Sequence, residues 1–220
     1  MMPLPSTDPV SLFLVLAAMA VLPFAAMVVT SYTKIAVVLG LLRNAIGVQQ
    51  VPPNMVLNGV AMIVSCYIMA PVLMEASEQM RGASTSATQS NAQQLLGAAD
   101  AAREPFRRFL DKHADPAEKA FFLKSAAAIW PAERAAQLKK DDLLVLAPAF
   151  LLTELSAAFR IGFLLYLAFV VIDLVIANVL LAMGLSQVTP TNVAIPFKLL
   201  LFIVLDGWPK LIHGLVLTYR

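Results

Sequence analysis

The segment from residue 143 to residue 185 is almost entirely apolar, and it limits the possible folds more than any other feature of the sequence. As one straight helix it would be roughly 60 Å long, whereas the hydrocarbon core of a bilayer is about 30 Å thick. It must therefore turn, break or project out of the membrane. Because water does not solvate such a run, it has to lie in lipid or be buried against other proteins.

The charged residues are gathered in one part of the chain. Ten of the fourteen acidic and ten of the sixteen basic residues lie between positions 75 and 142. The chain is 60% hydrophobic and 14% charged, against about 25% charged residues in soluble domains. This composition predicts an integral membrane protein or an obligate subunit of a membrane complex. A net charge of only +2, without a basic stripe among aromatics, does not indicate nucleic acid, and we expect none as a partner.

The apolar runs, caps and prolines predict an all-α fold of membrane-associated helical hairpins with a polar, mostly helical insert. Residues 1–74 are the N-terminal hydrophobic helices, residues 75–142 the polar insert and residues 143–220 the C-terminal hydrophobic hairpins. The first nine residues contain no lysine or arginine. We therefore expect a retained first helix rather than a cleaved signal peptide.

The same signals place the individual helices and breaks. Helices are expected at residues 10–29, 35–42, 55–74, 93–112, 117–129 and 193–204. The composition of residues 82–91 predicts a flexible loop. Pro105 should interrupt or restart the helix expected at residues 93–112. Asp115 and the pair Asp141-Asp142 are expected to cap the helices that follow them. Residues 206–210 should break the last helix before a short tail.

Three charged residues lie deep inside the longest apolar segment. A charge there is energetically unfavourable and usually has a structural or functional role. The three residues are Glu154, Arg160 and Asp173. Six positions separate Glu154 from Arg160, so the two lie on different helix faces and must find partners on another helix or another chain. A structural salt bridge between helices and a direct role in transport both remain open. Ala158 and Gly162 form a small-xxx-small pattern, which permits close helix approach.

Other polar residues border the apolar runs. Lys34 and Arg43 flank the end of an apolar helix, and side chains in such places commonly snorkel to the membrane interface. Lys198, Asp206 and Trp208 fit an anchor at the end of a helix, in which Lys198 snorkels and Trp208 lies at the interface.

No pattern of residues predicts enzymatic chemistry. The sequence lacks phosphate-binding, dinucleotide-binding, nucleophile-elbow and zinc-protease motifs, and its two histidines have no ligand cluster around them. Cys66 is the only cysteine and lies in an apolar run, so we interpret it as a packed apolar residue. We therefore expect no enzyme, no cofactor and no metal site.

Several strings outside the insert combine proline and polar residues with leucines in a specific order. They are TSYTK at 30–34, RNAIGVQQVPPN at 43–54, LAPAF at 146–150, AFRIGF at 158–163, FKLLLF at 197–202 and DGW at 206–208. With them the chain resembles the FliP/YscR family, the R subunits of the bacterial type III export apparatus of flagella and injectisomes. The residues that carry the most specific string are Arg43, Asn44, Gln49, Gln50, Pro52, Pro53 and Asn54. The short N-terminus without a signal peptide favours the injectisome branch.

The resemblance implies a core subunit of the export gate in the bacterial inner membrane. Several copies, five in the family, join the two smaller membrane subunits. The large export-gate and switch subunits and the inner rod or needle are further partners. Unfolded secreted proteins pass as cargo through the central pore, and a separate ATPase and the proton-motive force supply the energy. The family also implies a multi-pass protein with its polar insert in the periplasm and an assembly that projects in that direction.

Composition and buried charges alone fit a second class of function. This class is an oligomeric transporter or channel for small solutes or ions, in which the deep charges form a relay. A transporter this short would need oligomers or inverted repeats, and the sequence shows no internal repeat. The family motifs favour secretion. The candidate residues for assembly or buried charge are Glu154, Arg160, Asp173, Lys198 and Asp206.

One loop departs from the pattern of the family. The family commonly carries a run of methionines after a Met-Gly turn, and these soft side chains are thought to form a gasket that seals the pore. The corresponding residues are Met183, Gly184, Leu185, Ser186, Gln187 and Val188, so only one thioether remains. This substitution predicts a weaker seal.

Overall fold

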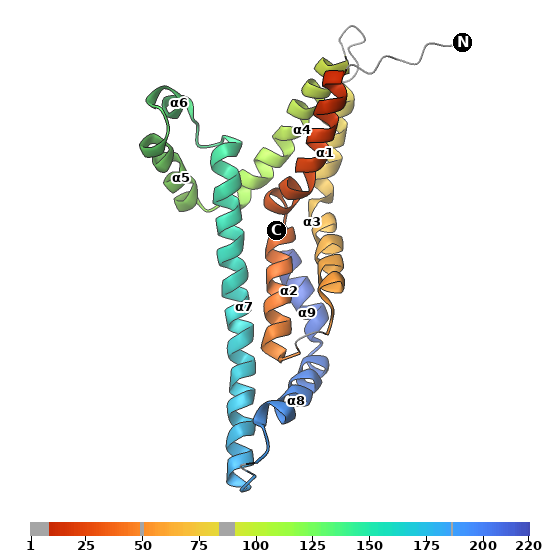
Figure 1. Cartoon of the computed structure of the whole chain (residues 1–220), viewed down its shortest axis with the longest axis vertical. Helices are drawn as coiled ribbons and strands as arrows, with labels where there is room; N and C mark the ends of the chain where they lie inside the picture. Colours follow the sequence, from red (N-terminus) through yellow and green to blue (C-terminus); the bar gives the residue numbers. More distant parts are fainter. Residues whose placement is uncertain (1–8, 49–50, 84–90, 186) are drawn as a thin grey trace, which may run out of the picture. The chain divides into compact units, whose positions relative to one another are not determined.

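The computed structural model describes the chain except residues 1–8, 49–50, 84–90 and 186 (Figure 1). The described residues form helices joined by turns, and they contain no strand, which confirms the expected all-α fold. The helices are α1 (Pro9–Val29), α2 (Tyr32–Ile46), α3 (Asn54–Ala83), α4 (Asn91–His113), α5 (Pro116–Ile129), α6 (Ala132–Gln137), α7 (Leu143–Ala182), α8 (Pro190–Val204) and α9 (Gly207–Leu217).

The chain divides into two compact units. One consists of Met1–Thr30 and Met69–Thr153, and the other of Ser31–Ile68 and Glu154–Arg220. The chain passes between the units at three places: between α1 and α2, inside α3 and inside α7. The division into three parts at residues 75 and 142 stays a prediction from the sequence.

The longest apolar segment forms one unbroken helix. We expected residues 143–185 to turn or break if they did not leave the membrane, but α7 continues through 40 residues from Leu143 to Ala182. After Pro148 the helix α7 contains one glycine, Gly162, and no proline, so its sequence does not favour a break. The loop predicted at residues 82–91 lies mostly outside the described residues.

Pro105 lies inside α4, so the interruption that we expected at this proline is wrong. A proline removes one backbone hydrogen bond of its helix. Here the side chain of Arg107 spans the same turn, because its Nε and Nη2 donate to the two carboxylate oxygens of Glu104 at 2.8 and 2.7 Å. This bond from Arg107 lowers the pKa of the Glu104 carboxyl below its ordinary value.

Asp115 caps α5 as predicted. Its carboxylate accepts a hydrogen bond of 2.7 Å from the backbone N–H of Ala117, and Pro116 occupies the first turn. The capping interaction expected at Asp142 differs, because its carboxylate accepts from the backbone N–H of Lys139 at 2.7 Å. The backbone carbonyl of Asp142 nevertheless starts α7 by accepting from Val145 and Leu146.

Replacing Asp115 with alanine is expected to weaken the start of α5 by about 1 kcal/mol, because the Ala117 amide loses its acceptor. Hydrogen exchange at the Ala117 amide measures this loss directly, and its protection should fall by roughly fivefold. The matched control is Asp115→Asn, which keeps a capping oxygen. An equal loss of protection in the asparagine variant would contradict the capping role.

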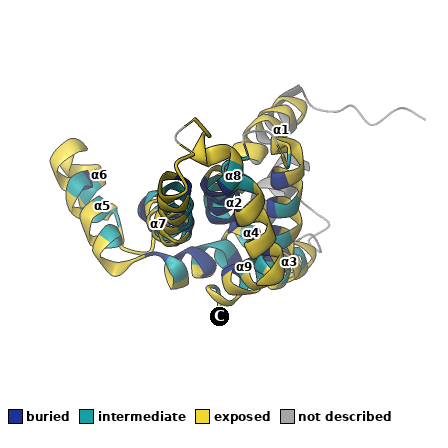
Figure 2. Ribbon diagram, turned by 90° about the horizontal axis from the view of Figure 1, so that it is seen from below, coloured by how far each residue is buried: buried dark blue, intermediate teal, exposed yellow. Residues whose placement is uncertain are grey.

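The core of the unit that contains α2 is built around that helix. Ile35, Val38 and Leu39 of α2 are fully buried, as is Ala158 of α7 (Figure 2). Leu57 and Ala61 of α3 and Leu215 of α9 complete the same cluster. One face of α2 therefore packs against several helices, as expected of an apolar helix with buried side chains along its whole length.

The small residues of α7 lie where α2 approaches it. Ala158 is fully buried in the α2 cluster. A Cβ atom placed on Gly162 would come within 2.2 Å of the Leu41 side chain, so any larger residue here requires Leu41 to shift. The small-xxx-small pattern thus faces α2 within the same chain.

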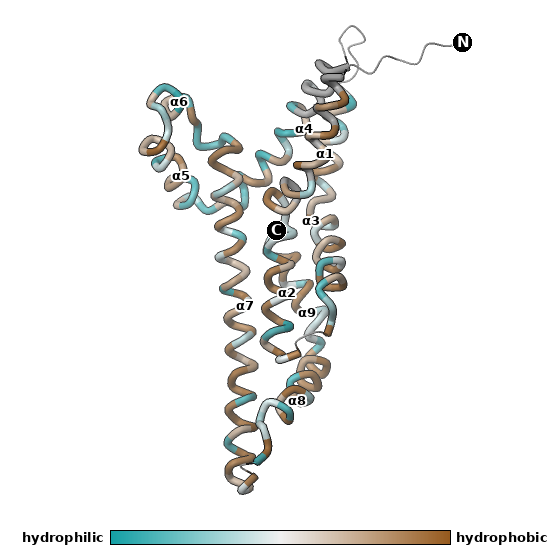
Figure 3. The backbone as a smooth tube through the Cα atoms, viewed as in Figure 1, coloured by the Kyte–Doolittle hydropathy of each residue, from teal (hydrophilic) through white to brown (hydrophobic). Residues whose placement is uncertain are grey.

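Much of the apolar surface of the long helices is uncovered. Residues 54–82 of α3 and the whole of α7 are long and apolar enough to cross a membrane (Figure 3). Helices α8 and α9, which are bent by 63° at their junction, pass the same test as a pair. Only 11% of the most apolar window of α7 is buried within the chain, so lipid or other proteins must cover the rest. Cys66, which we expected to be packed, is exposed on α3.

Candidate functional site: two ion pairs between helices

Lys34 and Glu154 form a buried ion pair between α2 and α7. The Lys34 ammonium lies 3.0 Å from Oε1 of Glu154, and the two side chains are 5% and 3% exposed. Lys34 therefore does not snorkel to an interface. The partner of Glu154 lies on another helix, in agreement with the argument from its spacing. A pair this far from water stabilises the fold only if its remaining polar atoms are also bonded.

Tyr219 completes the bonding of this pair. Its hydroxyl donates to the second carboxylate oxygen of Glu154, and its ring centroid lies 3.9 Å from the Lys34 ammonium. Burial, reinforced by the neighbouring Glu154 carboxylate, raises the pKa of Tyr219 well above its ordinary value. The phenol therefore stays protonated and remains a hydrogen-bond donor. A cation–π contact at this distance also stabilises the ammonium.

Lys198 of α8 forms a second pair with Asp173 of α7. The Lys198 ammonium lies 2.7 Å from the Asp173 carboxylate and also donates to the backbone carbonyl of Ala45 at 3.2 Å. The lysine side chain is 6% exposed and the aspartate side chain 43%, so the snorkelling interpretation of Lys198 is wrong. Ala45 lies in the last turn of α2, where carbonyls lack partners within the helix and favour a cation. Lys198 thus links three helices.

The proline-containing string builds the connection from α2 to α3. Gly47 ends α2 in a left-handed conformation with φ 90°, and its N–H donates to the carbonyl of Asn44. Arg43 donates to the side-chain oxygen of Asn54 at the start of α3. The carbonyl of Pro53 accepts from two backbone amides of that helix. Pro52 lies in the turn between these residues, whereas Gln49 and Gln50 lie outside the described residues.

Arg160 and Asp206 are placed differently from the other candidate charges. Both are exposed, and within the part of the chain that the structure describes neither forms an ion pair. Asp206 separates α8 from α9 with a left-handed backbone at φ 53° and ψ 44°, and its side chain makes no capping bond. The structure therefore places Glu154 in a buried pair and Lys198 in a partly buried pair, and it leaves Arg160 and Asp206 at the surface.

The loop that the sequence predicts as the gasket follows a regular helix end. Gly184 has φ 75°, and the amides of Gly184 and Leu185 donate to the carbonyls of Leu181 and Leu180. This is the Schellman arrangement, which needs a residue free to adopt positive φ and explains the Met-Gly turn. Met183, Leu185, Gln187 and Val188 are exposed, and Ser186 lies outside the described residues.

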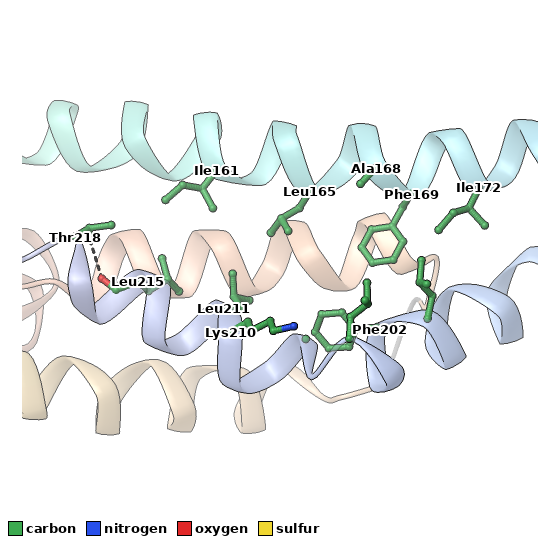
Figure 4. A pocket seen from close by; sticks show the side chains of 14 residues that line it. Ile161, Leu165, Ala168, Phe169, Ile172, Phe202, Lys210, Leu211, Leu215 and Thr218 are labelled. Atoms are coloured by element: carbon green, nitrogen blue, oxygen red, sulfur yellow. Dashed lines mark hydrogen bonds between the residues drawn. The ribbon is translucent and has the colours of Figure 1, made fainter.

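An apolar groove of about 580 Å³ lies between α7, α8 and α9 (Figure 4). Ile161 and Leu165 of α7, Phe202 of α8, and Leu211 and Leu215 of α9 line it. No group of three or more histidine, cysteine or carboxylate side chains suited to a metal ion occurs among the described residues. The arrangement holds helices together and offers apolar surface.

Comparison with known proteins identifies the family of this chain. Residues 15–215 match the FliP family. The chain is 70% identical to the hypersensitivity response secretion protein HrcR of Ralstonia nicotianae over 210 residues, 96% of this chain and 97% of that protein. It is 47% identical to the Yop proteins translocation protein R of Yersinia pestis over 212 residues, again 96% and 97% of the two chains. The virulence protein YscR of Salmonella typhimurium is 39% identical over 217 residues, with the same coverage.

The all-α fold and its apolar helices, which are long enough to cross a membrane, indicate a helical membrane protein. The chain belongs to the FliP family. Its relatives carry the names of secretion, translocation and virulence proteins, which confirms the resemblance to injectisome R subunits.

Proposed function

We propose that the chain is a core subunit of the export gate of a bacterial type III secretion system. It forms a homo-oligomer, with the five copies usual in the family, and joins two smaller membrane subunits around a central pore. Unfolded secreted proteins pass through this pore. The observation that carries the proposal is the match to the FliP family over residues 15–215, together with identities up to 70% to secretion proteins.

The uncovered surface of α7 supports an assembly rather than a single copy in lipid. Its 40 residues correspond to roughly 60 Å, about twice the hydrocarbon core, so lipid alone cannot cover it. Phe159, Phe163 and Leu174 are each more than half exposed along its length. Neighbouring subunits would cover this apolar surface, as obligate partners do. The large export-gate subunit, the switch subunit and the rod or needle are the further partners we propose.

The proposed location is the bacterial inner membrane, with the assembly projecting toward the periplasm. The polar insert, residues 75–142, would face that side and remain in water. The role is structural, and it needs neither an enzyme site nor a cofactor.

The geometry of the charges argues against the alternative of a small-solute or ion transporter. A relay needs charged groups that a solute or proton can reach in turn. The Lys34 and Glu154 side chains are almost fully buried and are bonded to each other. Asp173 is bonded to Lys198. In the proposal these ion pairs hold α2 and α8 against α7.

Purification with partner subunits tests the function. The chain is co-expressed with homologues of the two smaller gate subunits and extracted in mild detergent, and native mass spectrometry should find a multi-subunit complex with several copies of this chain. The same chain should restore secretion in a bacterium that lacks its own R subunit. An isolated dimer that binds a small solute and restores no secretion would contradict the proposal.

The gasket loop gives a prediction of its own. Restoring thioethers with the changes Leu185→Met, Ser186→Met and Gln187→Met is expected to lower the permeability of the expressed complex to small ions, because flexible apolar side chains close a pore more tightly than polar ones. Ion flux across vesicles that contain the complex is the measurement. The control is Leu199→Met on α8, which adds a thioether outside the loop. Equal permeability of the loop variant and the original chain would contradict a sealing role.

A further inference from the structure

The charges outside the polar insert do not balance within the described chain. Three described carboxylates lie in the apolar parts, and two of them, Glu154 and Asp173, are bonded to buried lysines. The third, Asp206, makes no capping bond and no ion pair with the residues that the structure describes. On the longest apolar helix, Arg160 is likewise left without an ion pair among the described residues.

Arg160 lies on an apolar surface that cannot solvate it. Its neighbours Phe159, Phe163 and Leu164 are 58%, 65% and 61% exposed, so the guanidinium emerges among large apolar side chains. A partner that covers these side chains would also remove water from the guanidinium. Such a partner must supply an anion, and a carboxylate matches the planar, forked guanidinium best.

Asp206 offers a carboxylate in a matching setting. Its neighbours Leu205 and Trp208 are 51% and 39% exposed, so this side chain too is bordered by apolar surface. The left-handed backbone at this position needs a residue that tolerates positive φ, and asparagine or glycine would meet that need equally well. As the N-cap residue of α9, Asp206 places a negative charge at the favourable end of the helix dipole, but its carboxylate makes no capping bond. Among the described residues no ion pair uses this charge.

We propose that Arg160 of one copy forms an ion pair with Asp206 of the adjacent copy. The occupant of the α7 surface around Arg160 is thus a second copy of this chain, which presents its α8–α9 junction. The two surfaces differ, so the contact is head-to-tail and each copy uses one surface toward each neighbour. This pairing rests on the proposed oligomeric function and adds to it the residues that set the register between copies.

A charge exchange tests the pairing in the complete complex, co-expressed with the partner subunits. Arg160→Asp and Asp206→Lys are each expected to lower the assembled fraction on native gels by about tenfold, since each places like charges together in a desolvated contact. The double variant carries both changes and should recover assembly to within roughly twofold of the original chain. Asp206→Asn is the matched control for the backbone, because asparagine keeps the left-handed conformation and removes only the charge. It should weaken assembly less than Asp206→Lys.

Disulfide trapping supplies a second measurement that does not depend on the energy of the pair. Both chains carry Cys66→Ala, since Cys66 is exposed and would react. One chain carries Arg160→Cys, and a differently tagged chain carries Asp206→Cys. Oxidation of membranes that contain both chains should give a mixed dimer, whereas either chain alone should not form one.

The outcomes separate this proposal from the proposed function. If the original chain forms the multi-subunit complex but the double variant does not recover and no mixed dimer appears, the pairing is wrong and the function stands. If the double variant recovers and the mixed dimer forms, the pairing is supported. If the original chain stays monomeric with its partner subunits present, the oligomeric function fails and the pairing fails with it.

Discussion

The variant Glu154→Ala is expected to lose about 3–5 kcal/mol of stability, the largest effect of any single change considered for this chain. The change leaves the Lys34 ammonium buried without its carboxylate, and it also removes the acceptor of the Tyr219 hydroxyl. The free energy of unfolding, measured by titration of detergent-solubilised protein with sodium dodecyl sulfate and followed by circular dichroism, should fall by this amount. Native gels should show that the export complex no longer assembles. A secretion assay on the same cells should show loss of secretion.

The matched control removes both charges. In the double variant Lys34→Met, Glu154→Leu the unpaired charge is absent, and apolar replacement of a buried pair is often neutral or stabilising. This variant should regain most of the lost stability. A double variant as unstable as Glu154→Ala would show that the buried charge is not the cause. Fully assembled complexes of Glu154→Ala that fail to secrete would instead favour a direct role in transport.

The second large effect is expected at Gly162, where α7 meets α2. Gly162→Leu places a side chain where even a Cβ would lie 2.2 Å from Leu41, and overpacking of this kind costs about 1–3 kcal/mol. The same detergent titration measures the loss. Gly59→Leu on α3 is the matched control, because no atom lies within 4 Å of the position of its Cβ. That control should be neutral or slightly stabilising, since leucine favours a helix more than glycine.

Compensation at the facing residue sharpens this test. If crowding against Leu41 is the cause, Gly162→Leu combined with Leu41→Ala should be more stable than Gly162→Leu alone. No recovery in the combined variant, or an equal loss in Gly59→Leu, would contradict the packing argument.

The sequence predicted the kind of fold well because long apolar runs leave few alternatives. It was less accurate at helix ends. The apolar run that ends at Met74 continues as helix to Ala83, since Glu75 and the polar residues after it are as compatible with a helix as with a loop. The expected short tail is helix α9, because Pro209 lies in its first turn, where the missing N–H breaks no helical bond.

The candidate site was predictable only in part. A carboxylate or a guanidinium inside a long apolar run draws attention by its cost, and so Glu154, Arg160 and Asp173 were found. Their partners could not be read from spacing, because Lys34 lies 120 positions from Glu154 and no periodicity extends that far. Tyr219 gave no signal at all, since a tyrosine near the last helix is unremarkable until packing brings it to Glu154. The groove between α7, α8 and α9 likewise depends on tertiary contacts.

The separation of Lys34 from Glu154 has a consequence for biosynthesis. A ribosome adds about 5–20 residues per second, so the lysine precedes its carboxylate by roughly 6–24 s. During that interval α2 is an apolar helix whose Lys34 ammonium has no carboxylate partner, and burying it alone in hydrocarbon is costly. We therefore expect α2 to reach its final position only after α7 has been made, so that the lysine and its carboxylate enter the fold together.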